Sequence, residues 1–228
     1  MLDKIKSSIP TLLILLLVVF VLGSLTGKIK LDSIFKGKEE TDKVPATEID
    51  QTLWDKLVAE HPNSNPNAKA TLVEFGDFQC PACQKFHTIY KQLDPAYLEK
   101  VNLVFVNFPL EKIHDRARYA ARSAVAVEKQ GKFFDYHDML YDAQESWTTT
   151  NFSDSVELFV PYVTSLGLDV NKFKEDYQSR SVKDFVNNDL KTAEDLNLGS
   201  TPSLFINKKS VKVSDLESLK KVIDEAQN

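Results

Sequence analysis

The sequence has only two cysteines among its 228 residues, Cys80 and Cys83. With no other thiol, the chain cannot build the framework of several disulfides that holds many small secreted domains together. A disulfide between these two neighbours would close a loop so short that it adds little stability. The pair is therefore better explained by chemistry than by structural cross-linking.

The chain also lacks an excess of positive charge. Its net charge is −5 at pH 7, and residues of both signs are interspersed. It has no basic stripe, and its basic and aromatic residues are not interleaved in the way that follows a phosphate backbone. We therefore exclude nucleic acid as a partner.

One long apolar run is present, at residues 9–25, and it carries no charge. It is just long enough to cross a bilayer as a helix, and it follows Lys4 and Lys6 at the N-terminus. We predict a membrane anchor within residues 1–27. A cleaved signal peptide is the alternative, with Val21-Leu22-Gly23 as its cleavage site, although there is no A-x-A sequence there.

Composition divides the rest of the chain into a linker and a domain. Residues 28–69 are rich in charged residues, Asn and Pro, with a short helical pattern around Ile49–Ala59, and are predicted to be a linker. Residues 70–228 are predicted to be the domain. It opens with a strand at Thr71–Phe75, a helix that starts at Pro81 and runs to about Leu98, and a second strand at Val101–Phe108. This spacing predicts two parallel strands joined by a helical crossover.

A helical block is predicted at about residues 112–197, where apolar residues recur at helical spacing, as in Ala117, Ala120, Ala121 and Ala124. A β-hairpin is then expected at Ser203–Ile206 and Val211–Val213, followed by a closing helix at Asp215–Glu225. The fold class is thus α/β, with a helical block inserted between the two halves of a small sheet.

The Cys-Pro-Ala-Cys motif stands directly after a strand and at the start of a helix. Cys80 is expected to be the exposed nucleophile, because the positive end of the helix dipole stabilises its thiolate. Cys83, one turn further on, is expected to be the buried resolving thiol. Half of a zinc site is the alternative, but the four histidines, His61, His87, His114 and His137, offer no second ligand pair at the usual spacing.

Four motifs, in order, resemble the DsbA family of envelope disulfide oxidoreductases, in particular its membrane-tethered BdbD-like branch. They are Val73–Cys83 (VEFGDFQCPAC), Asn107–Leu110 (NFPL) with His114, Gln130–Phe133 (QGKF) with His137, and Gly199–Pro202 (GSTP). The similarity runs from about Asn67 to the C-terminus. It implies a thioredoxin fold, with the helical block as its insertion.

The resemblance also implies roles for individual residues. Cys80 and Cys83 are expected to form the redox-active disulfide, and Pro202 to be a cis-proline facing it. Thr201, Pro202, Pro81 and Ala82 are expected to contact substrate, Thr201 through its backbone.

Glu74 matches the family's buried acid, and burial between Val73 and Phe75 is expected to raise its pKa so that it exchanges a proton with Cys83. Ala82 differs from the histidine of the best-known members, which predicts a weaker oxidant. His114 and His137 are expected to be structural.

The expected function is to introduce disulfides into exported or unfolded proteins with free cysteines, with reoxidation by a membrane redox partner. No cofactor and no metal are predicted. The domain is expected outside the cytoplasm, although Lys28, Lys30, Lys36 and Lys38 after the apolar run outnumber the lysines before it and favour the opposite orientation. The alternatives are a membrane-tethered reductase or isomerase, and a binding module or zinc-bound domain without catalysis.

Overall fold

The computed structural model describes residues 45–227. The predicted anchor at residues 9–25 lies outside them, as does the first part of the predicted linker. Within residues 45–227, no helix is both long enough and apolar enough to span a membrane.

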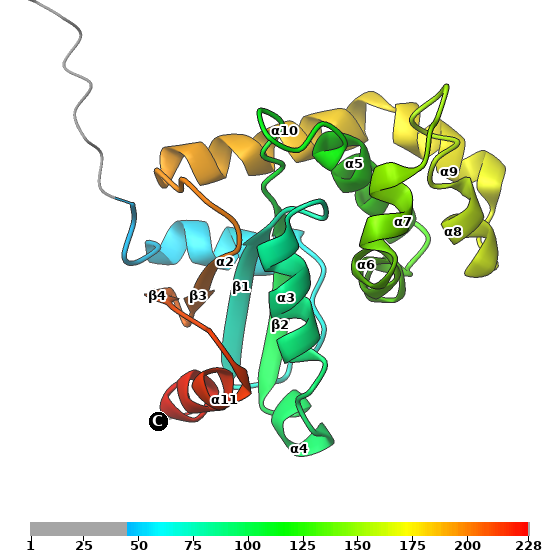
Figure 1. The fold of residues 1–228 in the computed structure, drawn as a ribbon. Coiled ribbons are helices and arrows are strands. Elements are labelled where there is room, and N and C mark those ends of the chain that lie inside the picture. The colour runs from blue at the N-terminus through cyan, green and yellow to red at the C-terminus, as the bar shows by residue number, and fades with distance from the viewer. Residues whose placement is uncertain (1–44, 228) are drawn as a thin grey trace, which may run out of the picture. The chain divides into compact units, whose positions relative to one another are not determined.

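Four strands and ten helices follow one another in the described part of the chain (Figure 1). In order they are α2 (Gln51–Glu60), β1 (Ala70–Gly76), α3 (Pro81–Tyr90), α4 (Pro95–Leu98), β2 (Val101–Asn107), α5 (Ala117–Glu128), α6 (Phe133–Asp142), α7 (Gln144–Thr149), α8 (Val160–Ser165), α9 (Val170–Gln178), α10 (Arg180–Asp195), β3 (Ser203–Ile206), β4 (Lys209–Val211) and α11 (Leu216–Glu225).

The strands form one sheet in the order β2-β1-β3-β4. β1 and β2 are parallel, which confirms the predicted crossover, and β3 runs antiparallel to both β1 and β4. The predicted hairpin is also confirmed, although its second strand begins earlier, at Lys209. Glu74 lies on the central strand β1, between Phe105 of β2 and Leu204 of β3.

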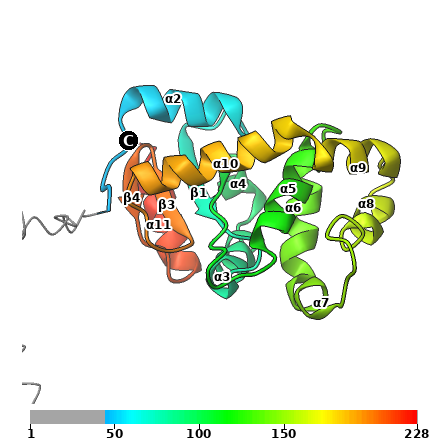
Figure 2. The same ribbon diagram turned by 90° about the horizontal axis from the view of Figure 1, so that it is seen from above.

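The two faces of the sheet bury different side chains. On one face, Val73 and Phe75 of β1 pack with residues of α2 and the end of α10. On the other face, Leu72 packs with residues of α3 and α11. Figure 2 shows α2 on the opposite side of the sheet from α11. The sheet is therefore enclosed, and a charged side chain that points inward from β1 has no access to water.

Helices α5 to α9 form a separate lobe beside the sheet, which confirms the predicted helical block. Alanines 117, 120, 121, 124 and 126 make the buried side of α5 small. These short side chains let α6, α9 and α10 contact α5 closely. The apolar core of this lobe includes Cys80 and Cys83, so the motif lies where the lobe meets the sheet domain.

The described part of the predicted linker differs from expectation, because it belongs to the packed domain. Ile49 is fully buried, and Trp54 and Leu57 of α2 are buried in the same cluster. Residues on either side of α2 form isolated bridges, from Glu48 to Lys209 and from Asn63 to Val104. The polar residues of α2 form its outer side, while its apolar residues cover the sheet.

The first long helix also ends earlier than predicted, at Tyr90 rather than Leu98. Residues 91–94 break it, and α4 then starts at Pro95 with Asp94 as its N-cap. Pro95 has no N–H for an interior helical bond, so the chain restarts as a new helix there.

We expect Gly76→Ala to destabilise the protein by about 1–3 kcal/mol, because a Cβ at this position would overlap the ring of Phe105. The Cζ atom of Phe105 would lie only 2.7 Å away, and that ring is fully buried and has no room to move. Gly199→Ala is the matched control, since no described atom lies within 4 Å of its added Cβ. Equal unfolding free energies of the two variants in a denaturant titration would contradict the expectation.

Candidate active site

The Cys pair lies at the start of α3. Cys80 is the N-cap residue and Pro81 opens the helix, as predicted. Both thiols are in the reduced state, and Cys83 is fully buried whereas Cys80 is 7% exposed. Cys80 is thus the more accessible sulfur, but it is less exposed than the sequence suggests.

The two thiols have opposite acidities. The hydrogen bond from Cys83, together with the N–H groups of Ala82 and Cys83, lowers the pKa of Cys80 to about 5 against the effect of burial. Burial and the hydrogen bond to Cys80 raise the pKa of the Cys83 thiol well above its usual value. The Asp77 N–H donates to the Cys83 sulfur at 3.5 Å. The arrangement provides one stable thiolate and one thiol that keeps its proton.

Glu74 lies beneath the Cys pair and is buried, as predicted. Burial is the main cause that raises its pKa to about 8, and the charge of Cys80 adds to the effect while a hydrogen bond with Cys83 opposes it. Its Oε1 atom has no hydrogen-bond partner among the described residues. The carboxyl group is therefore close to Cys83 and can hold or release a proton near neutral pH.

The Thr201–Pro202 peptide bond is cis, which confirms the expectation for Pro202. Cys80 Sγ lies 3.4 Å from the Thr201 carbonyl oxygen and donates to it when protonated, so the bond before Pro202 lies against the nucleophile. A groove of about 490 Å³ begins here, and Ala82 and Pro202 line it together with Lys85, Phe86, Leu204 and Val213. Of the residues expected to contact substrate, Pro81 and Thr201 are not among those that line this groove.

Asp77 was not predicted to have a role, yet its buried carboxylate holds the loops of the site together. Its Oδ1 accepts from the Gln79 N–H at 2.8 Å. Its Oδ2 accepts from the Leu110 N–H at 2.9 Å and lies 2.7 Å from Nδ1 of His114. His114 is thus bonded to the residue whose N–H contacts the Cys83 sulfur.

Gln144 of α7 is a second residue that sequence reasoning missed. Its Nε2 donates to the carbonyl oxygens of Phe78, at 2.7 Å, and Cys80, at 3.1 Å. These bonds fix the backbone immediately before the helix that carries the thiols. No motif in the sequence signals this contact, because the partners are separated by more than 60 positions.

Comparison with known proteins agrees with this geometry. The family described as Thioredoxin matches residues 59–225. A probable disulfide bond formation protein D from Bacillus anthracis is 32% identical over 161 residues, which are 69% of this chain and 74% of that protein. A Na(+)/H(+) antiporter NhaA 1 from Mycolicibacterium gilvum is 32% identical over 152 residues. These residues are 66% of this chain but only 24% of the antiporter.

Among solved structures, the chain is similar to oxidised BdbD from Bacillus subtilis, with a TM-score of 0.64. The two are 23% identical, and the similarity covers 82% of this chain and 98% of BdbD. At that identity the structure supports the fold, while the Bacillus anthracis relative supports the family. The chain belongs to the DsbA family of thiol–disulfide oxidoreductases, with the thioredoxin fold of that family and a Cys80–Cys83 pair at the start of its α3.

Proposed function

We propose that this chain introduces disulfide bonds into exported proteins, using the Cys80–Cys83 disulfide as the oxidant. The observation that carries the proposal is the position of Cys80 at the N-cap of α3, where the Cys83 thiol and the N–H groups of Ala82 and Cys83 lower its pKa to about 5. A stabilised thiolate stabilises the reduced form of the pair, and this makes the disulfide form a stronger oxidant. The name of the Bacillus anthracis relative, a probable disulfide bond formation protein, supports the same direction.

The exchange begins when a substrate thiolate attacks Cys80 Sγ of the disulfide. A bond forms between the two sulfurs, the Cys80–Cys83 bond breaks, and Cys83 leaves as a thiolate that takes a proton from Glu74. A second substrate thiolate then attacks the substrate sulfur, and Cys80 leaves as a thiolate. The substrate loses two electrons and gains a disulfide, while the Cys pair gains the two electrons.

The groove beside Ala82 and Pro202 is where the substrate chain lies in this scheme. Its floor is apolar, with Phe86 and Leu204, so it suits an unfolded segment with exposed apolar side chains.

A membrane redox partner reoxidises the pair after each cycle. The domain works outside the cytoplasm, and a reporter fused after Asn228 that is active only outside tests this, whereas a cytoplasmic result would favour a reductase.

The catalytic proposal is tested by mixing the oxidised full chain with a reduced, unfolded protein that carries two cysteines. We expect the test protein to lose two thiols for each chain while Cys80 and Cys83 become alkylatable. Cys80→Ser should show no transfer, and Lys56→Met, at an exposed position of α2 outside the groove, should retain it. If the thiols persist with the native chain, or if the reduced chain instead cleaves a substrate disulfide faster, the proposed direction is wrong.

A further inference from the structure

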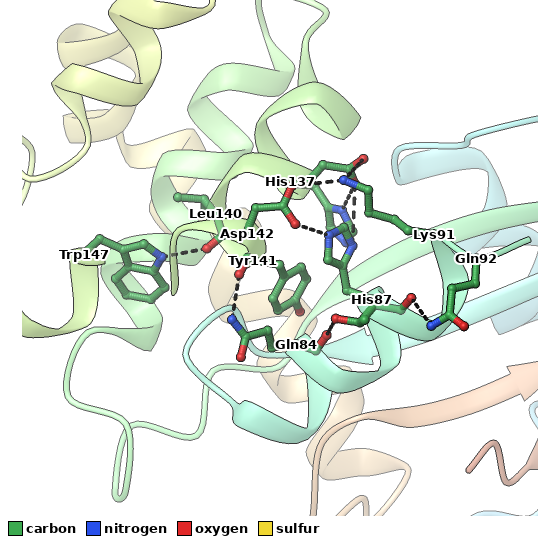
Figure 3. Close-up of polar contacts among 11 residues, drawn as sticks. Gln84, His87, Lys91, Gln92, His137, Leu140, Tyr141, Asp142 and Trp147 are labelled. Carbon is green, nitrogen blue, oxygen red and sulfur yellow. Dashed lines mark hydrogen bonds and ion pairs between the residues drawn. The ribbon is translucent and has the colours of Figure 1, made fainter. Parts of the chain in front are cut away.

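A second group of potential ligands lies one helical turn beyond Cys83, where α3 faces α6. Figure 3 shows His87 of α3, and Lys91 just after that helix, beside His137 and Asp142 of α6. The side chains of His87 and His137 are each 3% exposed, whereas that of Asp138, also on α6, is 45% exposed. Two buried imidazoles thus meet one carboxylate that reaches the surface.

The distances in this group suit a small cation. One ring nitrogen from each histidine and one Asp138 oxygen all lie within 4.8 Å of one another. His137 Nδ1 is 3.0 Å from Asp138 Oδ1, and His87 Nδ1 is 3.7 Å from the same oxygen. Bonds of about 2.0–2.1 Å at tetrahedral angles place neighbouring ligand atoms roughly 3.3 Å apart. The two Asp138 distances lie on either side of this spacing, and the two histidine nitrogens have to approach each other to reach it.

The contact between His87 and Asp142 favours the tautomer of His87 that can bind a metal ion through Nδ1. Its Nε2 lies 3.2 Å from Asp142 Oδ1, so a proton on Nε2 is held by that carboxylate. Nδ1 is then unprotonated and turns its lone pair toward Asp138. A carboxylate that binds the outer N–H of a histidine is the usual second contact of a metal-ligating imidazole.

His137 has a polar atom without a partner. Its buried Nε2 makes no hydrogen bond with any residue of the described chain. The rings of Tyr141 and Phe105 stand nearly perpendicular to it, with centroids 5.0 Å and 5.1 Å away. Without an ion, Nδ1 carries the proton and donates it to Asp138 at 3.0 Å, which leaves the Nε2 lone pair buried among these rings without a donor. A cation at Nδ1 would replace that proton, and Nε2 would then carry the proton of the ring.

We propose that His87, His137 and Asp138 bind a divalent transition-metal ion of the Zn²⁺ class, with Asp142 orienting His87. Two imidazoles and a carboxylate favour such an ion over Ca²⁺ or Mg²⁺, which prefer oxygen ligands. Lys91 supplies the positive charge when no ion is bound, since its Nζ lies 3.0 Å from Asp142 and 3.9 Å from Asp138. The ion joins α3, which carries the Cys pair, to α6 of the helical lobe.

The test uses the oxidised full chain, because a Cys80–Cys83 disulfide removes the thiolates as rival ligands. After treatment with a chelator, the chain is titrated with Zn²⁺ by calorimetry and with Co²⁺ by visible absorbance. We expect one ion for each chain, an absorbance typical of four-coordinate Co²⁺, and a higher melting temperature with Zn²⁺. No saturable binding, or binding only to the reduced chain, would overturn the site.

Three variants test one ligand, its outer contact and the competing cation without removing a buried ring. Asp138→Asn should weaken Zn²⁺ binding at least tenfold, and Asp142→Asn about 10- to 100-fold as an outer contact. Lys91→Met should tighten binding, because it removes a competing cation. Asp135→Asn is the control on the same helix and should leave the affinity unchanged, since Asp135 pairs with Lys132 at the surface. An unchanged affinity in Asp138→Asn would contradict the proposal.

Discussion

Alkylation of the reduced protein at pH 6 is expected to modify Cys80 at least about tenfold faster than Cys83. A thiol with a pKa of about 5 is about nine-tenths thiolate at this pH. Cys83, with a pKa well above the ordinary 9.0, is less than about 0.1% thiolate. The two thiolate fractions thus differ roughly a thousandfold, but the more acidic thiolate is about a hundredfold weaker as a nucleophile. A rate difference of about tenfold in favour of Cys80 remains. The burial of Cys83 increases this difference, because it limits access of the reagent.

The rates are read by mass mapping of the two cysteines over time with a small alkylating agent. Repeating the experiment from pH 4 to pH 8 should give a Cys80 rate that rises through about pH 5 and then levels off. Equal rates at the two cysteines, or a Cys80 profile that rises only above pH 8, would reverse the assignment of nucleophile and resolving thiol.

Glu74→Gln should slow reduction of the Cys80–Cys83 disulfide by a small thiol by about 100-fold, because an amide cannot protonate the departing Cys83. Burial, which the disulfide form shares, raises the pKa of Glu74, so the native rate, corrected for ionisation of the attacking thiol, should fall as the pH rises through that pKa. The variant should show no such fall. Glu60→Gln, on the exposed end of α2, is the control and should match the native protein.

The same substitution should change the dependence of stability on pH. The pKa of Glu74 is raised from 4.5 in the ordinary case to about 8 by burial, so the folded protein binds more protons than the unfolded chain between these values. Stability therefore falls as the pH rises through this window, by roughly 3 kcal/mol between pH 4.5 and 7. Glu74→Gln should lack this fall in a denaturant titration. A slope shared by both proteins would show that Glu74 ionises normally.

The parts of the site that follow from local patterns could be predicted from the sequence. Pro81 marks the start of α3, and this alone places Cys80 at the helix terminus. The apolar neighbours of Glu74 indicate an enclosed strand, and its burial follows. The repeat of small residues in α5 identifies the helical block, because helical periodicity does not depend on distant partners.

The remaining parts depend on contacts between distant positions. Asp77 follows the first strand, but nothing near it in sequence shows that its carboxylate meets Leu110 and His114. Just after α10, Asn197 takes the left-handed conformation with φ 55°, which Asn tolerates and which ends the helix there.

The reduction potential of the Cys80–Cys83 couple tests the central claim most directly. A Cys80 pKa of about 5 lies between the values of about 7 in thioredoxin and about 3.5 in DsbA, whose potentials are about −270 mV and −120 mV. We therefore expect a potential between these two values from equilibration of the full chain with glutathione buffers, which would make the chain a stronger oxidant than thioredoxin. A potential at or below that of thioredoxin would contradict the account, because the pair would then be a reductant.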